Sequence, residues 1–466
     1  QWYAFFLLVL GAPVLVVGLL GLGQVTGITL MLRRSLRQHA LSTIVTVVSV
    51  GLATGLLMSV FSIRKQTHDA FTSGATGFDA VLGARGSKLQ LVLNSVFHLE
   101  TSPGNIPWSS YEAIQKDARV KVAIPYATGD NYRGFRIVGT TMEFYREYTF
   151  GQERSLRMAD GTDVATFFDE KGDLKPGLAD HAGHRIPHSP IAQEAVLGSI
   201  AAQQAGLRHG DVFNTYHGLT YDETQKHSTQ FTVVGVLEPT NTPIDRVIWI
   251  PIEGYFHMAG HEPLDARGNK IEVDWTDPAS NEYRQVSAVM LRFRRSSMGQ
   301  MLEIQINRQG TTRTLAWPIA TIMAELFEKI GWANMVLEFV AYLVAVVAGA
   351  AILASIYNTM NERRREFAIL RALGAGRGTV FAAIVSESAA IAALGVALGF
   401  AIYAGLVAFA AVQIRNKAGV VLDVTAWHSA LLWAPLGMIA LGALAGMVPA
   451  YKAYSTDVAT NLVPAS

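Results

Sequence analysis

Histidine side chains, which could bind a metal ion, are concentrated in the polar middle of the chain. That region holds ten of the twelve histidines, and His181, His184 and His188 lie within eight residues of one another. Neutral imidazoles are good ligands for zinc, copper or iron. No flanking acidic pattern fixes a ligand geometry, so this cluster is either a metal site or a set of solvated loop histidines, and we favour the loop. A second pair, His257 and His261, has the spacing of one helix face.

Two acidic residues, Glu338 and Glu387, lie near or inside apolar segments. A carboxylate in lipid is costly and needs a partner or water. Glu387 has a serine on each side and lies near the end of its segment. We interpret this intramembrane carboxylate as a structural or coupling contact rather than a proton relay.

Signatures of catalysis are missing from the sequence. It has no cysteine, no phosphate-binding loop of the form Gly-x-x-x-x-Gly-Lys-Ser/Thr, and no Ser/His/Asp or paired-carboxylate arrangement. A formal net charge of +1 argues against a nucleic-acid partner. We therefore expect a protein that is not an enzyme and that has no cofactor of its own.

The segment Asn361–Ala375, between two long apolar runs, organises the rest of the chain. Its three consecutive arginines are too costly in lipid to lie within a membrane span, so they must lie beside one. Phe367, Leu370 and Leu373 place an apolar stripe on one side of a short helix, which Gly374 ends. We expect an amphipathic helix at the cytoplasmic membrane surface, able to dock on a cytoplasmic partner. An ordinary basic loop is the alternative.

Much of the chain is predicted to lie in lipid. Only 16% of its residues are charged, whereas soluble domains have about 25%. Five apolar segments have the length of a membrane span, namely Trp2–Leu22, Leu41–Phe61, Trp332–Tyr357, Val380–Val412 and Trp427–Ala450.

One topology places both arginine-rich stretches, at 33–37 and 363–365, in the cytoplasm. Its parts are a candidate extra N-terminal transmembrane helix (1–22), a surface helix with a transmembrane helix (29–62), an exterior domain (63–331), a transmembrane helix with an exterior stalk (332–357), the cytoplasmic helix (358–378), two further transmembrane helices (379–412 and 427–450) and a cytoplasmic tail (451–466).

The exterior segment is long enough for one sizeable domain. Runs rich in β-branched residues predict strands at Val120–Pro125, Phe135–Thr141, Phe231–Leu237, Val247–Pro251 and Val286–Phe293. The predicted fold class is thus an α-helical transmembrane bundle, with four core spans and a candidate extra N-terminal one, that carries a large mixed α/β domain.

The order of these parts resembles the FtsX/MacB-type ABC transporter permeases. The stretch Glu366-Phe-Ala-Ile-Leu-Arg-Ala-Leu-Gly-Ala375 is similar to a signature of that family, as is Pro449-Ala-Tyr-Lys-Ala453 near the C-terminus. In the exterior region, Ala195-Val-Leu-Gly198 and the strands Phe231–Leu237 and Val247–Pro251 resemble the MacB-type periplasmic core. Two departures are the extra first segment and the lack of the usual proline near the C-terminal end.

The resemblance implies a permease subunit that couples ATP hydrolysis on a separate ATPase subunit to a periplasmic conformational change that moves a substrate. Two copies of the ATPase would bind ATP and Mg, and a second permease copy would complete a homodimer or heterodimer. The location would be the bacterial inner membrane, and a periplasmic adaptor or binding protein is a further candidate partner. The residues that would form the ATPase-docking coupling helix are Glu366, Phe367, Leu370, Arg371, Leu373 and Gly374.

An alternative function is that of an FtsX-like transducer, which regulates an envelope enzyme without transporting a substrate. The large exterior domain favours transport. Neither the substrate nor the direction of transport can be derived from the residues.

Overall fold

The computed structural model describes residues 40–455 apart from 73–76, 152, 160–192, 259, 264–266, 268 and 276–277. The predicted N-terminal helix at 1–22, the surface helix before residue 40, and the histidines His181, His184 and His188 therefore lie outside the described residues. The chain divides into two compact units, which are described separately.

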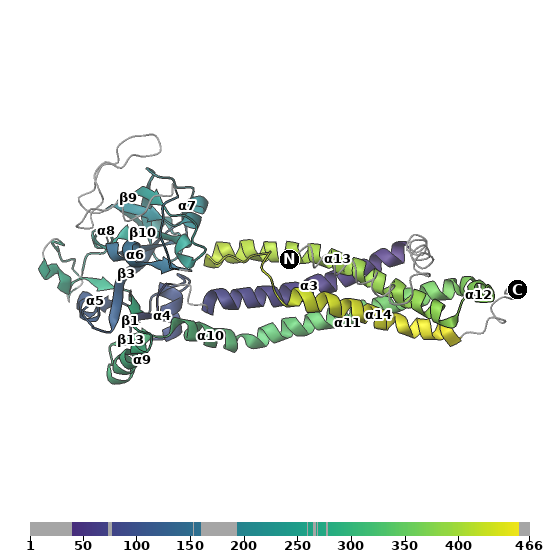
Figure 1. The fold of residues 1–466 in the computed structure, drawn as a ribbon. Helices are drawn as coiled ribbons and strands as arrows, with labels where there is room; N and C mark the ends of the chain where they lie inside the picture. Colours follow the sequence, from purple (N-terminus) through teal and green to yellow (C-terminus); the bar gives the residue numbers. More distant parts are fainter. Residues whose placement is uncertain are drawn as a thin grey trace. The chain divides into compact units, whose positions relative to one another are not determined.

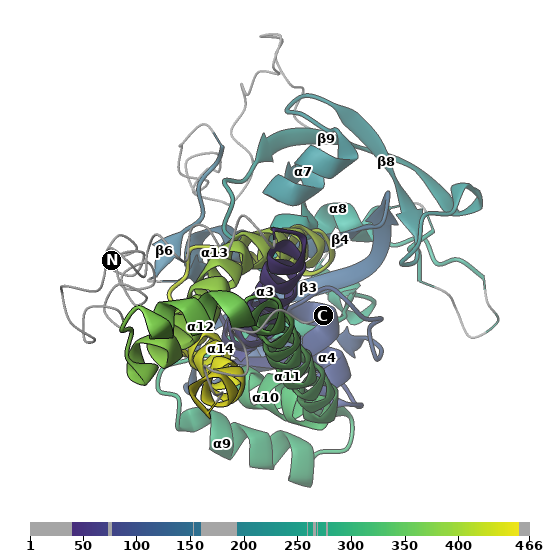
Figure 2. The same cartoon turned by 90° about the vertical axis from the view of Figure 1, so that its right-hand side faces the viewer.

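The first unit is a helical bundle, formed among the described residues by 40–66, Ile330–Ala411 and 422–455. Its long helices run side by side in Figure 1, and Figure 2 looks along them. Four helices of the described part are long and apolar enough to cross a membrane: α3 (Ala40–Thr72), α11 (Gly331–Glu362), α13 (Arg377–Ala418) and α14 (Ala430–Ser455).

Small residues allow α3 and α13 to approach closely. A Cβ atom added at Gly395 would lie 2.5 Å from Cβ of Val50, and one added at Gly399 would lie 2.8 Å from Cβ of Thr54. Real side chains do not come this close, so the approach requires glycine at both positions. The four-residue spacing of these glycines matches the small-residue contacts by which helices associate in lipid.

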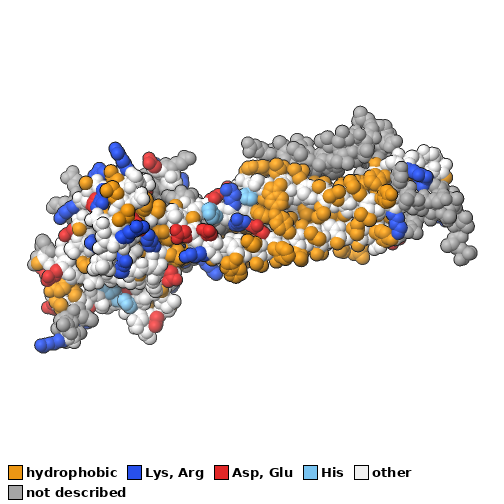
Figure 3. All heavy atoms as spheres, turned by 90° about the horizontal axis from the view of Figure 1, so that it is seen from below, with side chains coloured by type: hydrophobic (Ala, Val, Ile, Leu, Met, Phe, Trp, Pro, Cys, Tyr) orange, Lys and Arg blue, Asp and Glu red, His pale blue; other side chains and the backbone are white. Residues whose placement is uncertain are grey.

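The outer surface of the bundle is apolar. Figure 3 shows hydrophobic side chains over much of the bundle face in view. Phe339, Val346 and Phe409 on its helices are each at least 65% exposed. An apolar surface of this extent would be unfavourable in water and is the surface expected of helices in lipid. Glu338, near the start of α11, forms a salt bridge with Arg64 of α3, which gives this carboxylate the partner it needs.

The helix leading into the second span is interrupted. The sequence predicts one continuous helix from the exterior domain into this span. In the structure α10 (Ile319–Lys329) ends before Ile330, and α11 begins at Gly331. The stalk is therefore a separate helix from the span.

The second unit, Thr67–Lys329 with Val412–Val421, is a mixed α/β domain. Its described residues include a nine-stranded sheet in the order β13-β1-β12-β3-β4-β10-β7-β9-β8. These strands are β1 (Ala80–Ala84), β3 (Val120–Tyr132), β4 (Phe135–Thr140), β7 (Glu194–Leu197), β8 (Val212–His217), β9 (Lys226–Val236), β10 (Val247–Pro251), β12 (Ala288–Phe293) and β13 (Arg313–Ala316).

Shorter strands and helices complete this unit. The strands are β2 (Ile106–Pro107), β5 (Thr149–Phe150), β6 (Arg154–Ser155) and β11 (Gln285–Val286). The helices, besides α10, are α4 (Lys88–Ser95), α5 (Trp108–Gln115), α6 (Met142–Glu147), α7 (Ser199–Ala205), α8 (Ile252–Phe256) and α9 (Met298–Glu303).

One end of the sheet closes on itself. Strand β8, the last in the order, also pairs with β3, so that β3, β4, β10, β7, β9 and β8 form a ring. The pairing of β3 with β8 places Asp130 opposite His217 and Asn131 opposite Tyr216. Between Thr128 and Asp130 the register of β3 against β4 shifts by one residue, which makes Gly129 a β-bulge.

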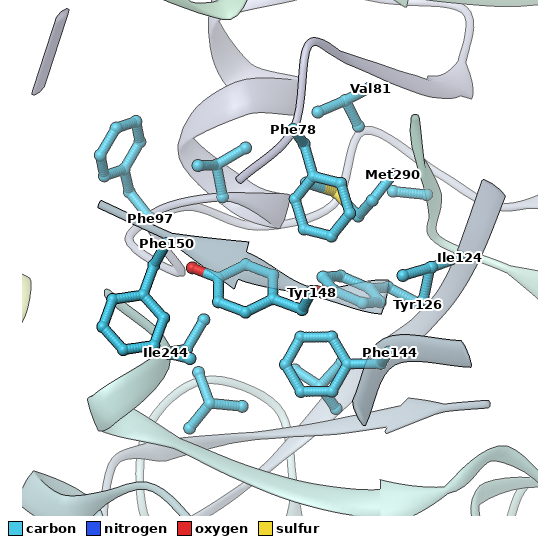
Figure 4. Packing of buried hydrophobic residues seen from close by; sticks show 14 of the residues in the cluster. Phe78, Val81, Phe97, Ile124, Tyr126, Phe144, Tyr148, Phe150, Ile244 and Met290 are labelled. Atoms are coloured by element: carbon cyan, nitrogen blue, oxygen red, sulfur yellow. The ribbon is translucent and has the colours of Figure 1, made fainter. Parts of the chain in front are cut away.

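An aromatic core holds the domain together. Figure 4 shows Phe78, Tyr126, Phe144 and Tyr148 packed with aliphatic side chains from several elements. Phe144 stacks on the fully buried Trp249 of β10 with ring centroids 4.1 Å apart. Rings of this size bury a large apolar area each and gain further from stacking, so this cluster fixes β3, β10 and α6 against one another.

Candidate functional sites

A short helix, α12 (Arg364–Ala372), connects the spans α11 and α13. It ends as the sequence predicts. Gly374 has φ of +100°, a backbone conformation that favours glycine. The N–H of Ala375 donates to the carbonyl of Leu370 and that of Gly374 to the carbonyl of Arg371, at 3.0 and 3.1 Å. These two bonds form a Schellman motif, which turns the chain directly into α13.

The apolar side chains of α12 point in two directions. Phe367 is partly buried against the core of the bundle, and Ala368 is buried. Leu370 and Arg371 are half-buried, whereas Glu366 is exposed. Ile369 is 44% exposed and Leu373 is 80% exposed. The surface that α12 presents is therefore centred on Ile369 and Leu373, while Phe367 anchors the helix to its own bundle.

Arg363, the residue directly before α12, contacts α13 through its side chain. Its guanidinium lies 3.4 Å from a carboxylate oxygen of Glu387 and 3.0 Å from one of Glu366. It also lies over the ring of Phe367, 5.2 Å from the centroid. The side chains of Arg363 and Glu387 are only 11% and 12% exposed. The acidic residue that the sequence places in an apolar segment thus has an arginine partner at the base of α12.

Comparison with known families covers most of the chain. Residues 43–289, more than half of it, match the MacB-like periplasmic core domain, and residues 338–458 match the FtsX-like permease C-terminal domain. The chain belongs to the FtsX/MacB-type ABC transporter permeases. The predicted fold class is confirmed, because this permease combines four helices able to span a membrane with a large mixed α/β periplasmic domain. It is a component of an ABC-type transporter or transducer.

Two solved structures are among those similar to this permease. The periplasmic region of MacB from Actinobacillus actinomycetemcomitans is 9% identical with a TM-score of 0.29, and the match covers 56% of this chain and 98% of that one. The extracellular domain of the noncanonic ABC-type transporter YknZ from Gram-positive bacteria is 11% identical with a TM-score of 0.24, covering 51% and 98%. No curated protein sequence matches. At these low TM-scores, the family assignment depends on the sequence matches alone.

The periplasmic domain of this permease contains a second candidate site. Asp130, His217, His227 and His261 each offer one ligand atom, and these four atoms lie within 4.8 Å of one another. Asp130 comes from β3, His217 ends β8, His227 is near the start of β9, and His261 follows α8. The predicted pairing of His261 with His257 on one helix does not occur, because α8 ends at Phe256.

No sequence pattern singled out Asp130, His217 or His227 as site residues. His217 and His227 lie on either side of the connection between the antiparallel strands β8 and β9, but neither β8 nor this hairpin was predicted from the sequence. The aspartate comes from a distant strand, which no local spacing could indicate.

The carboxylate of Asp130 is fully buried at the centre of this cluster. Its Oδ1 atom lies 3.1 Å from Nδ1 of His217 and 3.1 Å from Nε2 of His227. Burial alone would raise the pKa of the Asp130 carboxyl, but hydrogen bonds from these two rings and the contact with His261 lower it below its usual range. The hydrogen bond to Asp130 correspondingly raises the pKa of His217. The site is therefore a buried negative charge surrounded by imidazoles.

Proposed function

We propose that this chain is the transmembrane subunit of an ABC transporter, which couples ATP hydrolysis on a separate ATPase subunit to movement of its periplasmic domain and thereby moves a substrate. The observation that carries the proposal is α12, a short helix fixed between two spans and bearing exposed apolar residues. Ile369 and Leu373 would enter a groove on the ATPase, with Glu366, Leu370 and Arg371 around them.

The contact between Arg363 and Glu387 supports a coupling role for α12. A helix that only connected two spans would not need a nearly buried ion pair at its base. With this pair and the packing of Phe367 on the bundle core, a displacement of α12 would be transmitted to α13. In this proposal the ATPase binds ATP and Mg, two ATPase copies serve a permease dimer, and the assembly lies in the bacterial inner membrane.

The test is co-purification of the full chain with its ATPase subunit, together with ATP turnover of the complex in nanodiscs. Leu373→Asp places a charge in the proposed contact while costing little folding energy, because Leu373 is 80% exposed. We expect this variant to insert normally but to lose the ATPase and its turnover. Ile369→Asp should have the same effect.

A matched control is Met301→Asp. Met301 is 66% exposed on α9 in the periplasmic domain, so the same change of charge there should leave ATPase binding intact. Binding and turnover like those of the wild type in Leu373→Asp and Ile369→Asp would show that α12 is only a basic connection between spans.

A further inference from the structure

The contact between Asp130 and His261 has no hydrogen bond that would stabilise it when the His261 ring is neutral. Oδ2 of Asp130 and Nε2 of His261 are 3.1 Å apart, yet both atoms are buried without a hydrogen-bond partner. Nδ1 of His261 lies 3.0 Å from the carbonyl oxygen of Tyr255, which can only accept a hydrogen bond. The neutral His261 ring therefore carries its proton on Nδ1, and the lone pair on Nε2 faces the carboxylate.

Two lone pairs at this distance repel each other unless a cation lies close to both. Within the described part of the chain, no lysine or arginine forms a salt bridge with Asp130, and its three ionic contacts are all with histidines. A permanent protein cation therefore does not fill this role. Burying a carboxylate without a cation is costly, so the positive charge comes either from a second proton on His261, whose Nε2–H would then donate to Oδ2, or from a bound metal ion.

The side chains around this carboxylate have the composition of a transition-metal site. Three imidazole nitrogens and one carboxylate oxygen are ligands typical of four-coordinate zinc. Tetrahedral ligands at the usual zinc bond lengths are about 3.3 Å apart, close to the 3.1 Å at which each histidine nitrogen lies from Asp130. The three rings are also evenly spaced, with centroids 5.2 to 6.0 Å apart.

Features around the ligands match those of known metal sites. A metal-bound histidine usually donates its other ring N–H to a carbonyl or carboxylate, as Nδ1 of His261 does to Tyr255. The bulge at Gly129 directs Asp130 toward the rings, and bulges commonly re-aim side chains in this way next to functional sites. His217 is 57% exposed, whereas His227 and His261 are each 9% exposed, so an ion could enter on the side of His217.

We propose that Asp130, His217, His227 and His261 bind one first-row transition-metal dication, for which Zn²⁺ is the best match. The bound ion would join β3, the β8–β9 hairpin and the turn after α8 at the place where the ring of strands closes. This inference concerns the periplasmic domain alone and does not depend on the role of α12.

The test uses the full chain in detergent, stripped of metal and titrated with Zn²⁺ in competition with a chromophoric chelator. We expect one strongly bound Zn²⁺ per chain, an increase in Tm with Zn²⁺ concentration because only the folded state has the site, and intense visible bands with Co²⁺ typical of tetrahedral coordination. His217→Gln should weaken Zn²⁺ binding by more than about tenfold, which is the loss seen when only an outer partner of a ligand is removed.

His217→Gln is the most informative variant because this side chain is mostly exposed and the glutamine amide can still donate to Asp130, so the metal-free Tm should stay close to that of the wild type. His261→Gln should weaken binding equally. The matched control is His257→Gln, which alters a histidine near His261 but outside the cluster and should leave binding unchanged.

A second control replaces His181, His184 and His188 by Asn together, which tests the other histidine cluster. The proposal is overturned if the wild type takes up no more Zn²⁺ than His217→Gln, since the cluster would then hold only protons. It is also overturned if the triple variant alone abolishes the bound Zn²⁺.

Discussion

The guanidinium of Arg363 and the carboxylate of Glu387 meet at 3.4 Å, where both side chains are almost completely withdrawn from solvent. Arg363 directly precedes α12, and Glu387 lies in the third turn of α13. The ion pair therefore adds a non-covalent contact between the exposed docking helix and a membrane-spanning helix, which are otherwise linked by the backbone. In such surroundings the loss of one partner costs more than the pair contributes, because the other charge is left buried.

We predict that Glu387→Gln and Arg363→Met each destabilise the protein by about 1–3 kcal/mol. The double variant should be less destabilised than the sum of the two, because it leaves no buried charge. Thermal or denaturant unfolding of all four proteins in one detergent measures this double-mutant cycle. The control is Glu366→Gln, since Glu366 is 53% exposed and its pair with Arg363 should contribute less than about 0.5 kcal/mol. Strictly additive effects of the two changes would show that the contact between Arg363 and Glu387 is not energetically coupled.

The direction of the chain across the membrane can be tested with single cysteines, because the sequence contains none of its own. An impermeant thiol reagent should label Ser296→Cys in intact spheroplasts, since Ser296 is exposed in the periplasmic domain. Gly376→Cys, which lies between α12 and α13, should be labelled only after lysis. Labelling of position 376 in intact cells would place α12 on the periplasmic side and remove it from any cytoplasmic ATPase.

The contact of α3 with α13 predicts that replacing two glycines of α13 by alanine will have very different effects on stability. Gly399→Ala would place a methyl group 2.8 Å from Thr54, which must force the helices apart, at a cost of about 1–3 kcal/mol. At Gly405 nothing lies within 4 Å of an added Cβ, so Gly405→Ala should be neutral or slightly stabilising. Unfolding temperatures in one detergent compare the two, and equal values would mean that this contact does not exist.

His98 should make the periplasmic domain less stable in acid. Burial, and then the positive charges of Arg136 and Arg246, lower the pKa of His98 to about 3. Between about pH 6.5 and this value the unfolded chain binds a proton that the native state does not. Stability should therefore fall as the pH falls below about 6.5, by up to about 1.4 kcal/mol per pH unit from this residue.

Replacement of this histidine isolates its contribution. His98→Asn removes the titrating ring and keeps a residue type that accepts the positive φ of 55° found there. Denaturant unfolding between pH 4.5 and 7.5 should show a flatter pH dependence for this variant than for the wild type. Parallel curves for His98→Asn and the wild type would contradict the prediction.

Hydropathy and charge were sufficient to predict the helical unit. Each of the four long helices overlaps an apolar segment chosen from the sequence, because a span in lipid requires a continuous run of apolar residues. The strands at Phe135, Phe231 and Val247 were also predictable from β-branched runs. The closure of β8 onto β3 was not, since strand order depends on pairing between distant segments, which local patterns do not encode.

The two candidate sites also differ in how far each could be predicted from the sequence. The helix α12 lies in one short stretch with its own stripe and stop signal, so its existence was predictable, although the inward direction of Phe367 was not. That direction depends on where the bundle core lies, which is a tertiary property. The cluster around Asp130 collects side chains from four separate places, and only His261 attracted attention in the sequence, for a helical pairing that does not form.

The bulge at Gly129 makes the cluster depend on the length of β3 as well as on its residues. Side chains alternate between the two faces of a strand, so removing one residue turns everything beyond it to the opposite face. Asp130 is the first residue after the bulge. A homologous chain that conserves the aspartate and all three histidines but lacks the extra residue would direct its carboxylate away from the rings. Comparison of relatives should therefore align the spacing within this strand before it compares the ligands.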